Sequence, residues 1–243
     1  MIPIPAIDLR GGKVVRLSRG DFKEGKVYDE KPERVAVRFE GEGAGRLHVV
    51  DLDGALGGRP RNLAAVEAVL GKVKIPVQVG GGIRDLKTAE SYFKRGVRWA
   101  ILGTQACLDE GFLKEAISEY ADRVIVGIDA REGRVATDGW TKVSKVSAVE
   151  FAKKVETLGG QTVIYTDISK DGLLGGPNLN GVRELSRAVA LSVIASGGVS
   201  SIQDIQNLLR LKQPNLVGVI IGKALYEKKL SLPEAVKTCL QKE

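Results

Sequence analysis

The sequence predicts a single (β/α)8 barrel, an α/β fold in which eight strand–helix units close into a ring. Short apolar runs alternate with longer amphipathic segments eight times along 243 residues, a length that such barrels commonly reach as one domain. No linker or low-complexity stretch divides the chain, so we expect one domain over residues 1–243. The order of motifs also repeats, which predicts two half-barrels of about 1–120 and 121–243.

The eight apolar runs are the predicted barrel strands, because short β-branched runs are typical of parallel strands buried on both faces. They are Ile2–Ile7, Leu47–Val50, Val77–Val79, Ala100–Leu102, Val124–Ile128, Thr162–Thr166, Val193–Ser196 and Val217–Ile221. Pro3 and Pro5 conflict with the first run, since proline is unfavourable in a central strand. We therefore expect this strand to be short or to start late.

The segments between the runs carry apolar residues at three- and four-residue steps, which predicts helices. They are Pro32–Glu42, Asn62–Leu70, Leu86–Arg95, Phe112–Tyr120, Ala148–Leu158, Leu179–Ala188 and Ile202–Leu211. Asp85, Ser147, Asn178 and Ser201 stand at predicted N-cap positions. A doubly wound open sheet is the alternative architecture. It fits less well, because no G-x-G-x-x-G opens the first strand–helix turn and the repeat suggests symmetric closure.

Composition and charge exclude several classes of function. The net charge is +7, but the basic residues are scattered among acidic ones, which disfavours a nucleic-acid partner and is compatible with a field that attracts an anionic substrate. Two cysteines (Cys107 and Cys239) and one histidine are too few for a disulfide framework or a soft-ligand metal site. No apolar stretch is long enough to span a membrane and no basic, cleavable leader is evident, so we expect a cytoplasmic protein without metal or membrane partner.

Two aspartates are the candidate acid and base. Asp8 ends the first predicted strand and Asp129 ends the fifth, so half a barrel separates them and both should face the mouth. Paired carboxyl groups in unlike environments can divide acid and base roles, although a strand-end aspartate can also simply cap a loop. Thr166 ends the sixth strand and can donate to a substrate oxygen or a catalytic carboxylate, and Asp171 follows it closely.

Glycines in matched positions predict two phosphate sites. Gly81 and Gly82 follow the third strand, and Gly197 and Gly198 follow the seventh. Gly103 with Thr104, and Gly222 with Lys223, would complete each site from the next strand. Bare backbone N–H groups before a helix suit a phosphate, and the last two strands of this fold are a known phosphate position. Two such sites indicate a ligand with a phosphate at each end.

Four further residues are candidate substrate contacts. His48 lies before Asp51 near the mouth, where substrate contact and a core position are equally compatible with the pattern. Trp140 lies in a long polar loop, 131–145, and could close over a ring or pack against its own loop. Arg19 and Arg84 are candidate phosphate or lid contacts.

These residues carry a resemblance to a known family. The segments PAIDLRGGKVVRL, HVVDLDGA, QVGGGIR, ILGT, GIDAREGRVATDGW, TDISKDG, ASGGVSS and GVIIGKAL look like the ProFAR isomerases of histidine biosynthesis. The resemblance runs from Ile4 to about Leu225, and its many short motifs in fixed order make it specific.

The resemblance implies a half-repeated barrel without cofactor or metal. Separately, we expect the protein to be a monomer. The resemblance also implies an Amadori rearrangement of a bis-phosphorylated aminoimidazole carboxamide ribonucleotide, with Asp8 as base and Asp129 as acid. Thr166 and Asp171 would assist, the glycine pairs would hold the phosphates, and Trp140 would cover the aminoimidazole. Leu173 and Lys223 depart from the commonest family pattern of threonine and arginine, which leaves phosphate contacts there open.

Three alternatives remain at this point. The sister cyclase subunit of imidazole glycerol phosphate synthase shares the aspartate pair, but typically has cysteine and lysine where this chain has Ala6 and Arg16. A dual-substrate isomerase that also rearranges phosphoribosylanthranilate would use identical chemistry. A non-catalytic phosphate-binding barrel would not need both aspartates.

Overall fold

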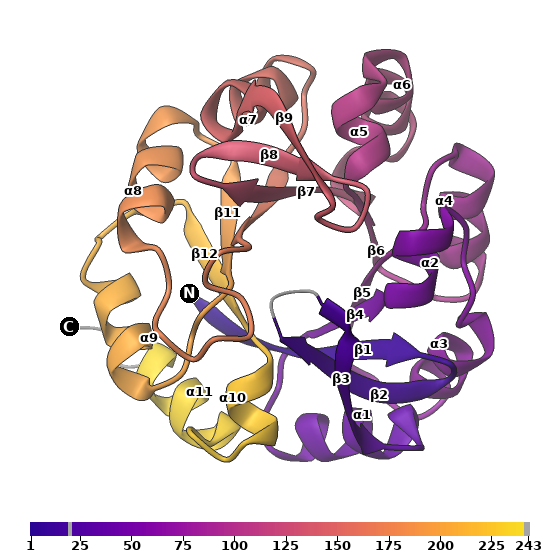
Figure 1. Cartoon of the computed structure of the whole chain (residues 1–243), viewed down its shortest axis with the longest axis vertical. Coiled ribbons are helices and arrows are strands. Elements are labelled where there is room, and N and C mark those ends of the chain that lie inside the picture. Colours follow the sequence, from indigo (N-terminus) through magenta and orange to yellow (C-terminus); the bar gives the residue numbers. More distant parts are fainter. Residues whose placement is uncertain (19–20, 241–243) are drawn as a thin grey trace.

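The computed structural model describes residues 1–18 and 21–240 as a closed parallel barrel with helices outside it (Figure 1). Each barrel strand pairs in parallel with the next, and the β12–β1 and β7–β10 pairings close the ring. The predicted (β/α)8 barrel is confirmed, and the open sheet is wrong. In ring order the strands are β1 (Ile2–Arg10), β4 (Leu47–Asp51), β5 (Val77–Gly80), β6 (Trp99–Leu102), β7 (Val124–Arg131), β10 (Thr162–Asp167), β11 (Ser192–Ser196) and β12 (Leu216–Ile221).

The predicted helices form at the expected places around the strands. They are α1 (Pro32–Gly41), α3 (Leu63–Leu70), α4 (Leu86–Lys94), α6 (Glu110–Tyr120), α7 (Ala148–Thr157), α8 (Leu179–Ala188) and α9 (Ile202–Leu209), and α11 (Leu232–Leu240) follows the last strand. Asp85, Ser147, Asn178 and Ser201 each accept a hydrogen bond from a backbone N–H in the first turn, so the predicted caps are confirmed. Short helices that sequence periodicity does not reveal follow three strands: α2 (Leu52–Gly57), α5 (Thr104–Leu108) and α10 (Lys223–Tyr226).

The first strand corrects one expectation, because it is nine residues long and includes both prolines. It pairs with β12 over residues 2–5 and with β4 over residues 6–9. Pro3 and Pro5 therefore lie where the strand has one paired neighbour. A proline there can turn its missing N–H toward the unpaired side and break no ladder bond.

Two antiparallel hairpins extend the barrel at its mouth and were not predicted. β1 continues into β2 (Lys13–Ser18) and β3 (Asp21–Asp29), and β7 continues into β8 (Arg134–Thr137) and β9 (Lys142–Ser147). The segment expected as the polar loop 131–145 is thus largely paired strand. β9 has no buried residue and β8 is only four residues long, so hydrophobic periodicity carries little signal for either strand.

Side chains that point into the barrel form a layer of isoleucines beneath the site. Ile4, Ala6, Ile101, Ile125, Ile164, Ile194 and Ile220 form one buried cluster inside the barrel. Successive side chains of a strand point to opposite faces, so Asp8 shares a face with Ile4 and Ala6, and Asp129 with Ile125. Both carboxyl groups therefore lie above the filled barrel interior, toward the carboxyl ends of the strands.

The two halves repeat a local network beneath the site. Asp51 at the end of β4 accepts a hydrogen bond from the Asn62 side chain at 2.6 Å. Asp167 at the end of β10 accepts one from Asn178 at 2.6 Å, with the same spacing in sequence. The repeated sequence spacing is thus accompanied by a matching hydrogen bond at each position.

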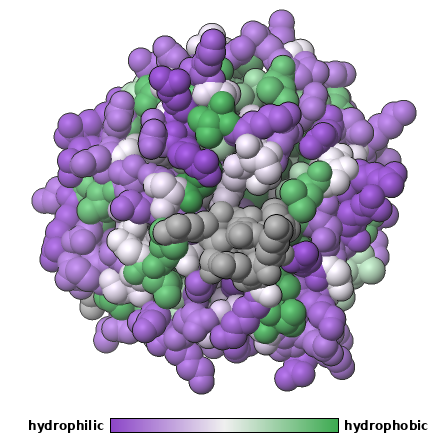
Figure 2. All heavy atoms as spheres, viewed as in Figure 1, coloured by the Kyte–Doolittle hydropathy of each residue, from purple (hydrophilic) through white to green (hydrophobic). Residues whose placement is uncertain are grey.

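Within the described residues, no helix combines the length and apolarity needed to cross a bilayer. On the face shown in Figure 2, hydrophilic residues dominate the rim and hydrophobic ones occur as separate small groups.

Candidate active site

One pocket at the carboxyl ends of the barrel strands brings the predicted site residues together. Every predicted site residue in the described part of the chain lines it, and Arg19 lies outside the described residues. The lining residues from the prediction are Asp8, His48, Gly81, Gly82, Arg84, Gly103, Thr104, Asp129, Trp140, Thr166, Asp171, Gly197, Gly198, Gly222 and Lys223.

Asp8 is held in the pocket by a cation that sequence reasoning did not assign to the site. The Nη1 atom of Arg16, on β2, lies 2.7 Å from the Asp8 carboxylate, and the Arg16 side chain is buried. Burial raises the pKa of Asp8 to about 6, against the opposing charge of Arg16, while the negative charge of Asp171 adds to the rise. The carboxyl group is thus poised to gain or lose a proton close to neutral pH.

Asp129, on β7, faces Asp8 from the opposite side of the ring, since four strand steps separate β1 from β7. It has neutral partners: the Trp140 indole N–H donates to its Oδ2 at 2.8 Å, and Thr166, its register neighbour on β10, also bonds to it. Burial raises the pKa of Asp129, and these two hydrogen bonds oppose the rise. Without a cation beside it, this carboxyl group retains a proton more readily than an exposed aspartate.

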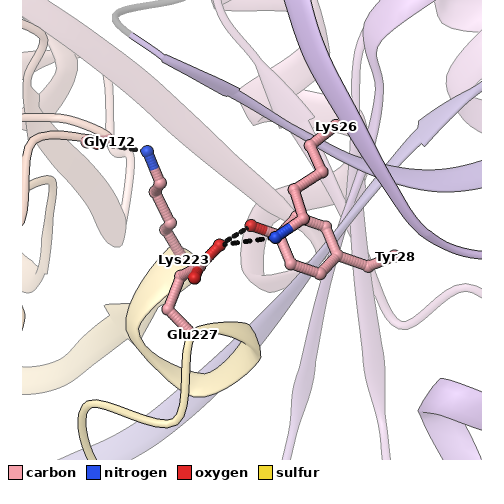
Figure 3. A network of polar contacts seen from close by, with 5 residues as sticks. All are labelled: Lys26, Tyr28, Gly172, Lys223 and Glu227. Atoms are coloured by element: carbon pink, nitrogen blue, oxygen red, sulfur yellow. Dashed lines mark hydrogen bonds and ion pairs between the residues drawn. The ribbon is translucent and has the colours of Figure 1, made fainter.

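Asp171 lies in the loop after β10 and belongs to the same electrostatic cluster. Burial raises its pKa, and the charges of Arg16 and Lys223 lower it. Lys223 also fastens this loop, because its Nζ donates to the Gly172 carbonyl at 3.1 Å (Figure 3). Lys223 therefore contacts a neighbouring loop as well as lining the pocket.

The glycine turns form two cups on opposite sides of the pocket, one at β5 and β6 and the other at β11 and β12. Gly81 and Gly197 have φ values of 102° and 92°. A Cβ at either would overlap the carbonyl of Asp51 or Asp167, respectively. Gly103 and Gly222 match as well, with φ/ψ of −107°/−108° and −108°/−105°. The backbone turns of the two cups therefore match.

His48 is a neutral pocket wall. Nε2 of Gln78 lies 2.7 Å from its Nδ1, and burial together with the charges of Arg16 and Arg46 lowers its pKa to about 3. A neutral imidazole can donate or accept a hydrogen bond to a ligand but adds no positive charge. Gln78 is fully buried and was not predicted.

The β8–β9 hairpin is fastened over the first cup. The backbone N–H of Asp138 donates to Oγ1 of Thr104 at 2.9 Å, and Arg84 lies 3.9 Å from the Asp138 carboxylate. Trp140, two residues on, reaches Asp129 from this hairpin. Arg84 thus contacts the hairpin that carries Trp140.

Comparison with known proteins identifies the family to which this chain is similar. The histidine biosynthesis protein family matches residues 2–231. A protein of Alkaliphilus metalliredigens is 50% identical over 232 residues, 96% of this chain and 97% of that protein. One from Bacillus cereus is 52% identical over 233 residues, 96% of each chain, and one from Syntrophus aciditrophicus is 49% identical over 236 residues, 97% of this chain and 98% of the relative.

All three relatives bear the same name, 1-(5-phosphoribosyl)-5-((5-phosphoribosylamino)methylideneamino)imidazole-4-carboxamide isomerase. The match covers every strand of the barrel and every residue of the pocket. This chain belongs to the histidine biosynthesis protein family.

Proposed function

We propose that this protein is the aldose–ketose isomerase of histidine biosynthesis that converts ProFAR, the compound in its relatives' name, to the ribulosyl isomer. The relatives' common name favours this isomerase over the cyclase subunit and over a non-catalytic barrel. The supporting observation is the unlike pair of carboxyl groups, Asp8 beside a cation and Asp129 beside neutral donors, between two glycine cups with matching backbone angles.

The partners of the two aspartates support an assignment of roles. Arg16 favours the ionised form of Asp8, which a general base needs, and a base is most effective when its pKa lies near the working pH. Burial with neutral partners favours the protonated form of Asp129, which a general acid needs. Asp8 is therefore the base and Asp129 the acid.

The reaction follows from this assignment. Asp129 donates its proton to the ribose ring oxygen, the bond from that oxygen to C1 breaks, and the ring opens to an iminium ion. Asp8 then removes the proton from C2, and the electron pair of that C–H bond forms the C1–C2 double bond of an enolamine. Tautomerisation of the enolamine gives the ketone. Thr166 steadies Asp129 through their hydrogen bond, and Asp171 assists proton handling.

The cups and Trp140 hold the substrate. Each cup presents backbone N–H groups to one terminal phosphate, with Gly81, Gly82, Gly103 and Thr104 on one side. Gly197, Gly198, Gly222 and Lys223 form the other side, where Lys223 supplies a positive charge. Trp140 covers the aminoimidazole ring, while His48 contacts the substrate as a neutral group.

Turnover of ProFAR by the purified protein tests the proposal. The product's absorbance change should appear with this protein alone, with no added metal or partner protein. Absence of turnover under these conditions would reject the isomerase. Addition of phosphoribosylanthranilate to the same assay decides whether a second substrate shares the pocket.

We also propose that the enzyme acts as a monomer in the cytoplasm. Both aspartates and both glycine cups belong to one pocket of one chain, so each chain carries the full set of proposed site residues. Cys107 and Cys239 are free thiols, as is usual in a reducing compartment. Light scattering during size-exclusion chromatography should give a mass near 26.0 kDa.

A further inference from the structure

Glu227 immediately follows α10, outside the pocket walls, and ties the first hairpin to this short helix. The Tyr28 hydroxyl on β3 donates to its Oε1, and Nζ of Lys26 lies 3.3 Å from the same oxygen (Figure 3). The ammonium of Lys26 also lies 4.8 Å from the centre of the Tyr28 ring. Two residues of one strand thus converge on a single carboxylate.

A second contact joins the same strand to the strand that carries Asp8. The rings of Tyr28 and Tyr226 are 5.0 Å apart at an angle of 50°. The Tyr226 hydroxyl donates to the backbone carbonyl of Ala6 at 2.8 Å, two residues before Asp8. Tyr28 therefore packs against a residue of α10 that is itself bonded to β1.

Arg16 lies on β2, the strand that pairs with β3 and its contacts to α10. In the β2–β3 register Arg16 pairs with Lys26, the residue that contacts Glu227. The guanidinium of Arg16 contacts Asp8 on the adjacent strand β1, and it lies so close to Gly222 that a Cβ there would overlap it. The contact of β3 with α10 thus fixes the backbone of Arg16 on the neighbouring strand β2. The absence of a side chain at Gly222 leaves room for the Arg16 guanidinium.

We infer that Tyr28 and Glu227 form a latch that holds Arg16 against Asp8, so both are positioning residues for the isomerisation. The inference rests on the proposed function for its catalytic consequence, while the contacts themselves do not depend on it. No change in the pocket wall is needed to break the latch, because neither side chain lines the pocket.

The charged and titratable groups that face Asp8 determine how its pKa would change if the latch were broken. They are the cation Arg16 from β2, the carboxylate of Asp171 from the loop after β10, and the phenol of Tyr226 from α10. Arg16 is the group among them whose charge favours the Asp8 carboxylate. When Arg16 moves away, the pKa of Asp8 must rise above its present value of about 6.

Two variants and one matched control test the latch. Tyr28→Phe removes one hydroxyl, and Glu227→Gln removes the charge that Lys26 and Tyr28 share. Glu30→Gln is the control, because Glu30 follows the same strand and pairs with Lys13 at 2.7 Å within the hairpin, with no tie to α10. Thermal unfolding checks that all three variants fold.

The first readout is the titration of the Asp8 carboxyl by carbon-13 NMR in the ligand-free protein. Both latch variants should titrate at higher pH than the parent, and Glu30→Gln should not. The second readout is the pH profile of kcat/KM for ProFAR. Its acid limb should move up with the pKa, with about a five-fold loss at pH 6, the loss of ionised Asp8 that follows from a rise of about one unit above a pKa of about 6.

An unchanged Asp8 titration in both variants would overturn the latch. A raised titration point with an unmoved acid limb would overturn its catalytic role, as would an equal effect of Glu30→Gln. A parent protein that does not turn over ProFAR rejects the proposed function instead, and the NMR titration still decides whether the latch exists.

Discussion

The two aspartates of the pocket differ in one partner, and that difference separates their proposed roles. Both are desolvated, which by itself would favour the protonated form of each. The guanidinium of Arg16 counters this at Asp8, whereas Trp140 and Thr166 bring no charge to Asp129. One arginine thus gives the two buried carboxyl groups different electrostatic environments, which suit the proposed base and acid.

Replacement of Asp129 by asparagine tests the acid. The amide of the new side chain cannot supply a proton to the ring oxygen, so kcat should fall about 100- to 10,000-fold, the usual contribution of general acid catalysis. Binding of the bis-phosphate product, measured by calorimetry, should remain, because the glycine cups are intact. An Asp129→Asn variant that retains parent-level kcat would contradict the role of Asp129.

The pH dependence of the reaction tests Asp8 and Arg16. Asp8 must be ionised to accept a proton, so kcat/KM of the parent should fall as the pH drops through about 6. Arg16→Gln removes the charge that favours the carboxylate, which raises the pKa of Asp8 and moves this limb to higher pH. Arg16→Lys retains a positive charge and should shift the limb less. Identical acid limbs in the parent and Arg16→Gln would show that this ion pair does not set the titration.

At the scale of single elements, the turns after the strands carry the most demanding backbone. Gly197 combines a φ of 92° with a close approach to the Asp167 carbonyl. Gly96, after α4, has a similar φ of 99°, but a Cβ there would meet open space. Substitution of these two glycines can therefore separate two destabilising effects: the strained backbone angle and the steric overlap with a carbonyl.

Alanine at each of these glycines measures the two costs. Gly96→Ala should lower the free energy of unfolding by about 1–3 kcal/mol, the range for a strained backbone angle. Gly197→Ala should cost more, because the new methyl group also displaces the carbonyl of Asp167 and with it the shape of the cup. Urea unfolding measures the free energy of unfolding of both variants. An equal loss of stability would show that the Asp167 carbonyl can move aside without an energetic cost.

At the scale of the whole molecule, the isoleucine layer supports the site from below. Ile194 is fully buried at the centre of the barrel. Parallel strands that share this layer keep their carboxyl ends at one level, so the opposed aspartates and both cups depend on the same packing.

Truncation of this layer should destabilise the barrel strongly. Ile194→Ala removes buried methyl groups and leaves a cavity, which typically costs about 2–5 kcal/mol. Ile2→Ala, where the isoleucine is 43% exposed on β1, should cost less than about 1 kcal/mol. Chemical unfolding measures both, and similar losses would mean that the central layer is not closely packed.

The sequence by itself determined what depends on local pattern. Strand and helix periodicity, the caps at Asp85, Ser147, Asn178 and Ser201, and the repeated glycine turns are all encoded within a few residues of one another. They were enough to predict the barrel, and with it the ends of strands where Asp8 and Asp129 meet in one pocket.

Only the tertiary structure decided which side chains meet across the pocket. Strand registers set the pairing of Arg16 with Asp8, the tolerance of Pro3 and Pro5 and the fastening of Tyr28 to Glu227. The contact of Trp140 with Asp129 likewise depends on a hairpin in which β8 is short and β9 has no buried residue, so neither strand shows a hydrophobic pattern. Such contacts depend on closure of the whole ring and on the space left by residues such as Gly222, and local periodicity contains neither.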